Sequence, residues 1–145
     1  MVGLLGKTDE DYAALMARLV LGGVMFPHGA QKLLGWFGGN GFSGTMAFFT
    51  GQMGLPWIIA FLVIMIEFFG ALGLIGGLLS RVNALGIGAV MLGAIFTSHA
   101  QYGFFMNWYG NKAGEGFEYH LLALGLAAVV LLKGGGAWAV DRLVE

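Results

Sequence analysis

The chain has 145 residues, of which 58% are hydrophobic and only 10% are charged. A soluble domain carries about 25% charged residues, and a core of this size cannot bury so much apolar surface, so the composition excludes an ordinary water-soluble domain. The net charge of −1 provides no basic field for nucleic acid, and the lack of cysteine excludes thiol catalysis, iron–sulfur ligation and attached c-type haem.

Long apolar segments dominate the chain. They lie at residues 12–34, 56–79, 82–103 and 117–134. A helix needs about 20 residues, each rising 1.5 Å, to cross a hydrocarbon core of about 30 Å. The sequence therefore predicts an all-α, integral membrane four-helix bundle, with residues 1–145 forming a single domain in a lipid bilayer.

The connection between the first two helices is unusual, because residues 35–56 are rich in glycine and aromatic residues and carry no charge. A solvated loop would be polar. The composition instead predicts an interfacial or partly re-entrant segment, with a short helix near residues 43–52 that Ser43 caps.

The distribution of basic residues predicts the orientation. With four helices, one side of the membrane receives Lys7, Arg81, Lys133 and Arg142, with Arg18 nearby, and the other side receives Lys32 and Lys112. Because basic residues concentrate on the cytoplasmic side, both termini are expected in the cytoplasm.

Several ionisable residues interrupt the apolar helices. A charge at the bilayer centre costs about 2.5–3.5 kcal/mol on insertion scales, so such groups are expected to face the bundle and to pair. At about 100° per residue, Arg18, His28 and Lys32 share one stripe of the first helix. We expect Glu67, in the second helix, to be ionised and either paired with Arg18 or bonded to His28.

These residues form the predicted site. Glu67, His28 and Lys32 are the catalytic candidates, and no metal-ligand set is expected. Candidate cofactor-binding residues are Arg18, His28, Gln31, Lys32, His99 and His120. Structural alternatives remain open: Glu67 and Arg18 as a packing lock, Lys32 extending to the interface, and each histidine as a satisfied group at a helix end.

The stretch RLVLGGVMFPHGAQKLLGWFG at residues 18–38 resembles the first helix of the DoxX family of small bacterial membrane proteins. Similar features follow in the family's order: Gly-Leu-Pro at 54–56, the Glu67 segment at 67–81, and GGGAWAVDRL at 134–143. The resemblance implies a four-helix protein of the bacterial inner membrane. Some relatives are subunits of a thiosulfate:quinone oxidoreductase, and others are linked to redox or oxidative-stress complexes.

The functional prediction is a redox-associated membrane subunit that binds a quinone. Quinone carbonyls need hydrogen-bond donors, which His28, Lys32, Gln31 and His99 can supply, while Glu67 can relay protons. Phe26, Trp36 and Phe37 are candidates for walling the ring. Because nothing marks a tightly bound metal or flavin, electrons are expected from a substrate or a redox partner subunit.

Other functions compete with this one. A scaffold or accessory subunit would use its outer loops to dock a partner. A small transporter ranks lower, because four helices enclose little volume unless the protein forms a homo-oligomer. A haem between two histidines of different helices ranks below a quinone.

Overall fold

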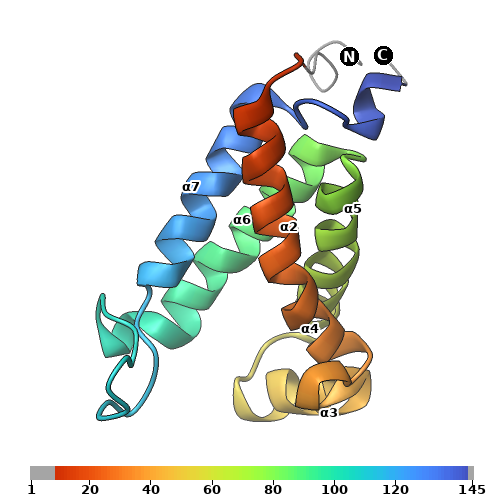
Figure 1. Ribbon diagram of the computed structural model, residues 1–145. Helices are drawn as coiled ribbons and strands as arrows, with labels where there is room; N and C mark the ends of the chain where they lie inside the picture. The colour runs from red at the N-terminus through yellow and green to blue at the C-terminus, as the bar shows by residue number, and fades with distance from the viewer. Residues whose placement is uncertain (1–8, 144–145) are drawn as a thin grey trace.

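The computed structural model describes residues 9–143 as helices joined by turns and loops, with no strand in that range (Figure 1). Helix α2 spans Tyr12–Leu33, and α3 spans Gly41–Ala47, followed by a π-turn at Phe48–Gln52. The second long helix joins α4 (Trp57–Met65), a π-turn (Ile66–Gly70) and α5 (Ala71–Gly76). The third joins α6 (Ser80–Ala94), a π-turn (Ile95–His99) and a 3₁₀ turn (Ala100–Tyr102). Helix α7 spans Glu118–Lys133, and a 3₁₀ turn at Val140–Leu143 follows.

Three helical segments are long and apolar enough to cross a membrane: Tyr12–Leu33, Trp57–Gly76 and Ser80–Tyr102. Helix α7 has 16 residues and is therefore about 24 Å long, which is shorter than a typical hydrocarbon core. The predicted all-α membrane fold is confirmed at this level. That α7 crosses the bilayer as a fourth span stays a prediction.

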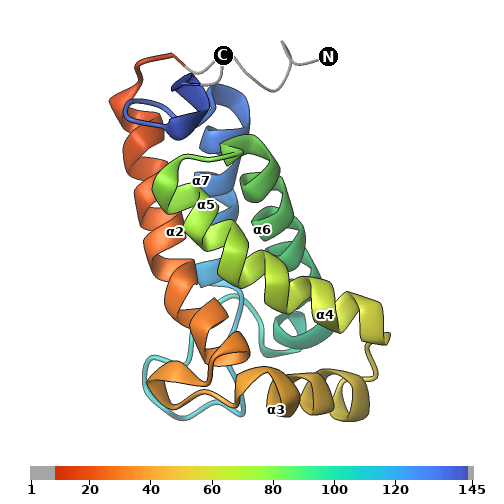
Figure 2. The ribbon, with the colours of Figure 1, turned by 90° about the vertical axis from the view of Figure 1, so that its right-hand side faces the viewer.

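The glycine- and aromatic-rich connection contains a short helix, as predicted, but this helix starts at a different residue. Helix α3 begins at Gly41, after Asn40, and no side chain caps it, so the predicted cap at Ser43 is wrong. Helix α3 lies across the ends of α2 and α4 (Figures 1 and 2). Its placement at or within the membrane surface stays a prediction.

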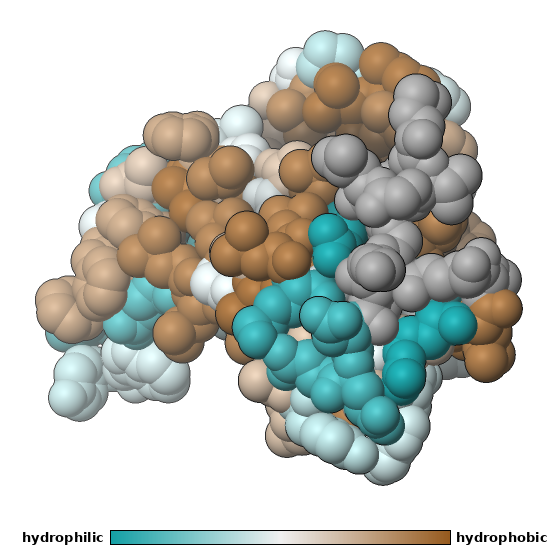
Figure 3. Space-filling view, turned by 90° about the horizontal axis from the view of Figure 1, so that it is seen from above, coloured by the Kyte–Doolittle hydropathy of each residue, from teal (hydrophilic) through white to brown (hydrophobic). Residues whose placement is uncertain are grey.

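The start of α2 and the final turn at Val140–Leu143 lie at the same end of the molecule, which we call the terminal end (Figures 1 and 2). Helix α3 and the loop at residues 103–117 lie at the opposite end, the loop end. Viewed onto the terminal end, hydrophilic residues gather in one part and hydrophobic residues cover much of the rest (Figure 3).

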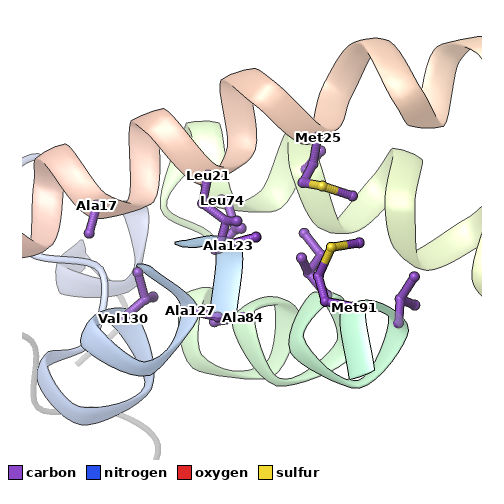
Figure 4. Packing of buried hydrophobic residues seen from close by; sticks show 12 residues of the cluster. Ala17, Leu21, Met25, Leu74, Ala84, Met91, Ala123, Ala127 and Val130 are labelled. Carbon is purple, nitrogen blue, oxygen red and sulfur yellow. The ribbon is translucent and has the colours of Figure 1, made fainter. Parts of the chain in front are cut away.

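The main core lies where α2, α5, α6 and α7 meet (Figure 4). Two α2 glycines allow close approach: a Cβ at Gly22 would lie 2.9 Å from the Ala71 carbonyl oxygen, and one at Gly29 would lie 2.6 Å from the Phe68 backbone. The backbones of α2 and the second long helix therefore run almost in contact. The buried core residues are Ala17, Leu21, Met25, Ala71, Leu74, Ala84, Ile87, Val90, Met91, Ala123, Ala127 and Val130.

Candidate functional site

Arg18 is 1% exposed and forms the centre of the terminal end. Its guanidinium donates to four backbone carbonyls: Nε to Gly135 at 2.8 Å, Nη1 to Leu74 at 2.7 Å and Ile75 at 2.6 Å, and Nη2 to Ala137 at 3.2 Å. Two of these acceptors, Leu74 and Ile75, are among the last carbonyls of α5, where helix geometry supplies few donors, and Leu74 also accepts from Gly77 N at 3.2 Å. Arg18 therefore joins the end of α5 to the C-terminal segment.

Asp141 completes this arrangement from the C-terminal segment. Its Oδ1 accepts from Leu79 N at 2.6 Å and its Oδ2 from Ser80 N at 2.8 Å, so it caps the first turn of α6 from 61 residues away in sequence. Such a cap satisfies orphan N–H groups and places a negative charge at the helix N-terminus. We call Arg18, Asp141 and the carbonyls that Arg18 binds the terminal knot.

The predicted pairing of Glu67 with Arg18 is therefore wrong. Side chains lean toward the N-terminus of their own helix. Since α2 and the second long helix run antiparallel, Arg18 leans toward the terminal end and Glu67 leans toward the loop end (Figure 1). A difference in depth that two extended side chains could bridge does not bring Arg18 and Glu67 together when they lean in opposite directions.

Glu67 pairs instead with Lys32, whose Nζ lies 2.6 Å from Glu67 Oε2. The Glu67 side chain is 6% exposed and that of Lys32 is 24% exposed, so the pair is shielded but open on the lysine side. The contact is an ion pair in distance, yet Oε2 accepts no hydrogen bond of regular geometry. Lys32 thus turns into the bundle rather than extending to the interface.

Local backbone features create this pair. Glu67 lies in the π-turn Ile66–Gly70, an irregularity that is frequent at functional sites. The absent side chain of Gly29 lets α2 touch the backbone of Phe68, one residue from Glu67. One helical turn later, Lys32 leans back toward this contact and reaches the carboxylate.

The remaining ionisable candidates gather nearby as a histidine–tyrosine cluster of His28, His99, Tyr119 and His120. The rings of His99 and His120 have centroids 4.2 Å apart, Tyr119 and His120 are at 5.3 Å, and His28 and Tyr119 at 6.1 Å. The predicted alternative partner of Glu67, His28, therefore lies against Tyr119.

Two observations describe the hydrogen bonding of His99 and His120. His99 Nδ1 lies 2.9 Å from the Glu115 carbonyl oxygen, to which it must donate, so its Nε2 carries the lone pair when the ring is neutral. His120 is 5% exposed, and its Nδ1 is buried with no hydrogen-bond partner. The touching His99 and His120 rings leave no room between them for a haem iron.

The other predicted residues are placed outside this cluster. Gln31 Nε2 donates to the Phe37 carbonyl at 3.3 Å and so ties the end of α2 to the following loop. Phe26 packs on Phe68, whereas Trp36 and Phe37 are exposed. Between residues 9 and 143, no group of three or more histidine, aspartate or glutamate residues is arranged to hold a metal ion.

The loop at residues 103–117 folds over the first turns of α7. Glu118 Oε1 accepts from Met106 N at 3.0 Å and from Trp108 Nε1 at 2.5 Å, while Asn107 exchanges hydrogen bonds with the Lys112 backbone. Between loop and helix lies a groove of about 390 Å³, which we call the Tyr119 groove. It is lined by Phe104, Met106, Trp108, Glu118, Tyr119, Leu121 and Leu122. Sequence reasoning missed the groove, because only the folded loop creates it.

Apolar helices of membrane-spanning length, with ionisable groups turned inward, define a helical integral membrane protein. Residues 13–100 match the DoxX family model, and the chain belongs to the DoxX family. It is a bacterial membrane protein.

Two curated relatives are similar to this chain. The inner membrane protein YqjF of Escherichia coli (strain K12) is 29% identical over 139 residues, covering 96% of this chain and 97% of the relative. The putative oxidoreductase CatD of Bacillus subtilis (strain 168) is 31% identical over 87 residues, covering 60% of each chain. No solved structure gives a significant match.

Proposed function

We propose that this protein is a redox-associated subunit of the bacterial inner membrane that binds a quinone at its loop end. The observation that carries the proposal is the shielded Lys32–Glu67 ion pair beside a histidine–tyrosine cluster whose His120 Nδ1 has no partner. Ionisable groups inside a membrane protein are expensive and usually mark a pathway for protons or substrates. The relative named a putative oxidoreductase and the inner membrane relative support the class and the location.

The residues of the site have separate roles in quinone reduction. Reducing a quinone to a quinol takes two electrons and two protons, and a carbonyl that gains negative charge is stabilised by nearby donors. His120 offers such a donor, and Lys32 offers a cation. Glu67 takes up and releases protons beside Lys32, while the electrons come from a redox partner subunit or a reduced substrate.

Quinone binding tests the proposal directly. The wild-type protein in lipid nanodiscs is titrated with decyl-ubiquinone, and binding is followed by quenching of tryptophan fluorescence. We expect saturable binding, and Glu67→Gln and Lys32→Met are expected to weaken it at least tenfold, because both remove charge from the site.

Lys133→Met is the matched control, because it removes a lysine from the end of α7 at the terminal end. It should bind quinone as the wild type does. The proposal is overturned by a wild-type protein that binds no quinone, or by equal losses in Lys32→Met and Lys133→Met.

A second candidate is a non-catalytic accessory subunit. The loop at residues 103–117 supports it, since this loop is held by internal hydrogen bonds yet exposes Phe105 by 65%, Trp108 by 74% and Tyr109 by 90%. Exposed aromatic residues of this kind suit a docking surface. Deleting the protein would then remove a catalytic partner from the membrane, whereas Glu67→Gln would leave that partner in place.

A further inference from the structure

The Tyr119 groove offers apolar surface and few free polar atoms. Its carboxylate, Glu118, already accepts from Met106 N and Trp108 Nε1. The rest of the lining comes from Phe104, Met106, Trp108, Tyr119, Leu121 and Leu122. A polar headgroup or a peptide backbone would find no adequate partners there, and binding would leave its polar groups unsatisfied. The groove therefore suits an apolar chain.

The groove also opens onto the outer surface of α7, where Leu121 is 44% exposed and Leu122 is 73% exposed. With α7 in the bilayer, as the sequence predicts, such leucines would contact lipid. A ligand dissolved in the bilayer can thus enter the groove sideways, without crossing water. Its volume of about 390 Å³ falls within the usual range of ligand sites, roughly 300–1,000 Å³.

Tyr119 connects the groove to the candidate site. At about 100° per residue, Tyr119 lies between Leu122 and His120 around the circumference of α7. One part of the residue lines the groove, and its ring contacts His28 and His120. Its hydroxyl donates to Met25 Sδ at 3.5 Å, which holds the ring against α2.

We propose that the Tyr119 groove binds the isoprenoid tail of the quinone, with the quinone ring on the other side of Tyr119 against the histidine–tyrosine cluster. This inference rests on the proposed function and adds the class of quinone: a lipid-soluble carrier with a long tail, bound ring inward from the bilayer. The tail then adds to the affinity of the ring through closer packing in the groove than among lipid chains.

The test compares a tailless benzoquinone with decyl-ubiquinone on the wild type, Leu122→Trp and Leu132→Trp in nanodiscs. Leu122→Trp fills the groove from its exposed side and is not expected to disturb folding, which the melting temperature checks. Leu132→Trp is the matched control, because Leu132 lies on the same helix, is 80% exposed and is not part of the groove.

At equal quinone concentrations within the bilayer, we expect the wild type to bind decyl-ubiquinone at least tenfold more tightly than the tailless ring. Leu122→Trp should lose about tenfold in affinity for the tailed quinone and less than twofold for the tailless one, while Leu132→Trp binds both as the wild type does. Equal affinity of the wild type for both quinones would overturn the groove but leave the proposed function standing.

Two other outcomes would also overturn the groove inference. If the wild type binds neither quinone, the groove inference and the proposed function fail together. If Leu122→Trp keeps full affinity for decyl-ubiquinone but loses a phospholipid that native mass spectrometry detects on the wild type, the groove holds an acyl chain and the inference is overturned.

Discussion

The terminal end and the loop end of this protein handle buried charge in opposite ways. At the terminal end, the cation of Arg18 is surrounded by four backbone carbonyls, and Asp141 satisfies the N-terminus of α6. At the loop end, Lys32 and Glu67 rely on one another, and His120 Nδ1 has no partner.

The difference agrees with a structural role for Arg18 and with the functional role proposed above for Lys32 and Glu67. Backbone carbonyls do not titrate and arginine keeps its proton, so Arg18 and its four acceptors have a single protonation state. A lysine–glutamate pair and three histidines can, by contrast, adopt several protonation states. Hydrogen bonds that are complete fix a fold, whereas groups that lack partners remain available to a ligand or a proton.

Removing Arg18 should produce the largest loss of stability. Arg18→Leu removes a donor from four carbonyls, of which Leu74 keeps a hydrogen bond from Gly77 N. At about 1–3 kcal/mol for each of the other three, we expect a loss of at least about 3 kcal/mol. The melting temperature in detergent and the monodisperse fraction on gel filtration measure it. Arg18→Lys retains part of the donors, so its stability should lie between those of the wild type and Arg18→Leu. A fully stable Arg18→Leu protein would contradict the structural role of the knot.

Breaking the Lys32–Glu67 pair should cost less stability than losing Arg18, and a second substitution should restore most of it. Lys32→Met leaves the Glu67 carboxylate buried without its cation, and we expect a loss of roughly 3 kcal/mol. Adding Glu67→Gln removes the unpaired charge, so the double variant should regain most of this stability but not quinone binding. Thermal melting and quinone titration of the two single variants and the double variant form the cycle.

A double variant that is as unstable as Lys32→Met would show that the pair serves packing. A double variant that also regains quinone binding would show that its charges take no part in function.

Loss of the α6 cap should have a moderate effect. Asp141→Ala removes the acceptors for the N–H groups of Leu79 and Ser80, and caps of this kind contribute about 0.5–2 kcal/mol. Thermal melting should show this decrease, with quinone binding unchanged. Asp141→Asn keeps one side-chain oxygen and should recover part of the loss. An Asp141→Ala protein with altered quinone binding would show instead that the terminal end and the loop end are coupled.

The smallest effect is expected at the exposed ion pair of Asp11 and Lys133, which joins the start of α2 to the end of α7. The hydrogen bond from Lys133, with a second from Ala14 N, lowers the pKa of Asp11 below its usual 3.8. Its stabilising effect is therefore complete above about pH 4 and is lost as the pH falls through the lowered pKa.

Melting temperatures of the wild type and Asp11→Asn, measured between pH 3 and 6, check this expectation. The difference between them should shrink toward the acid end. A difference that stays constant over this range would mean that the ion pair does not stabilise the fold.

The sequence determined the helices and their environment. Runs of apolar residues of spanning length predict helices in lipid whatever their neighbours are, and the predicted segments at 12–34, 56–79 and 82–103 match the three long helices within a few residues. The penalty that lipid places on an exposed charge also predicted that Arg18 and Glu67 face the bundle, whereas for Lys32 an extension to the interface stayed open.

Only the tertiary structure decided which of these charges meet. A constant turn of 100° per residue fails across the π-turn that holds Glu67, and the lean of side chains toward the helix N-terminus separates Glu67 from Arg18 while bringing it to Lys32. The return of Asp141 to α6 and the contact of His99 with His120 depend on residues distant in sequence. Local periodicity carries no information on such contacts, because they are set by how the helices pack.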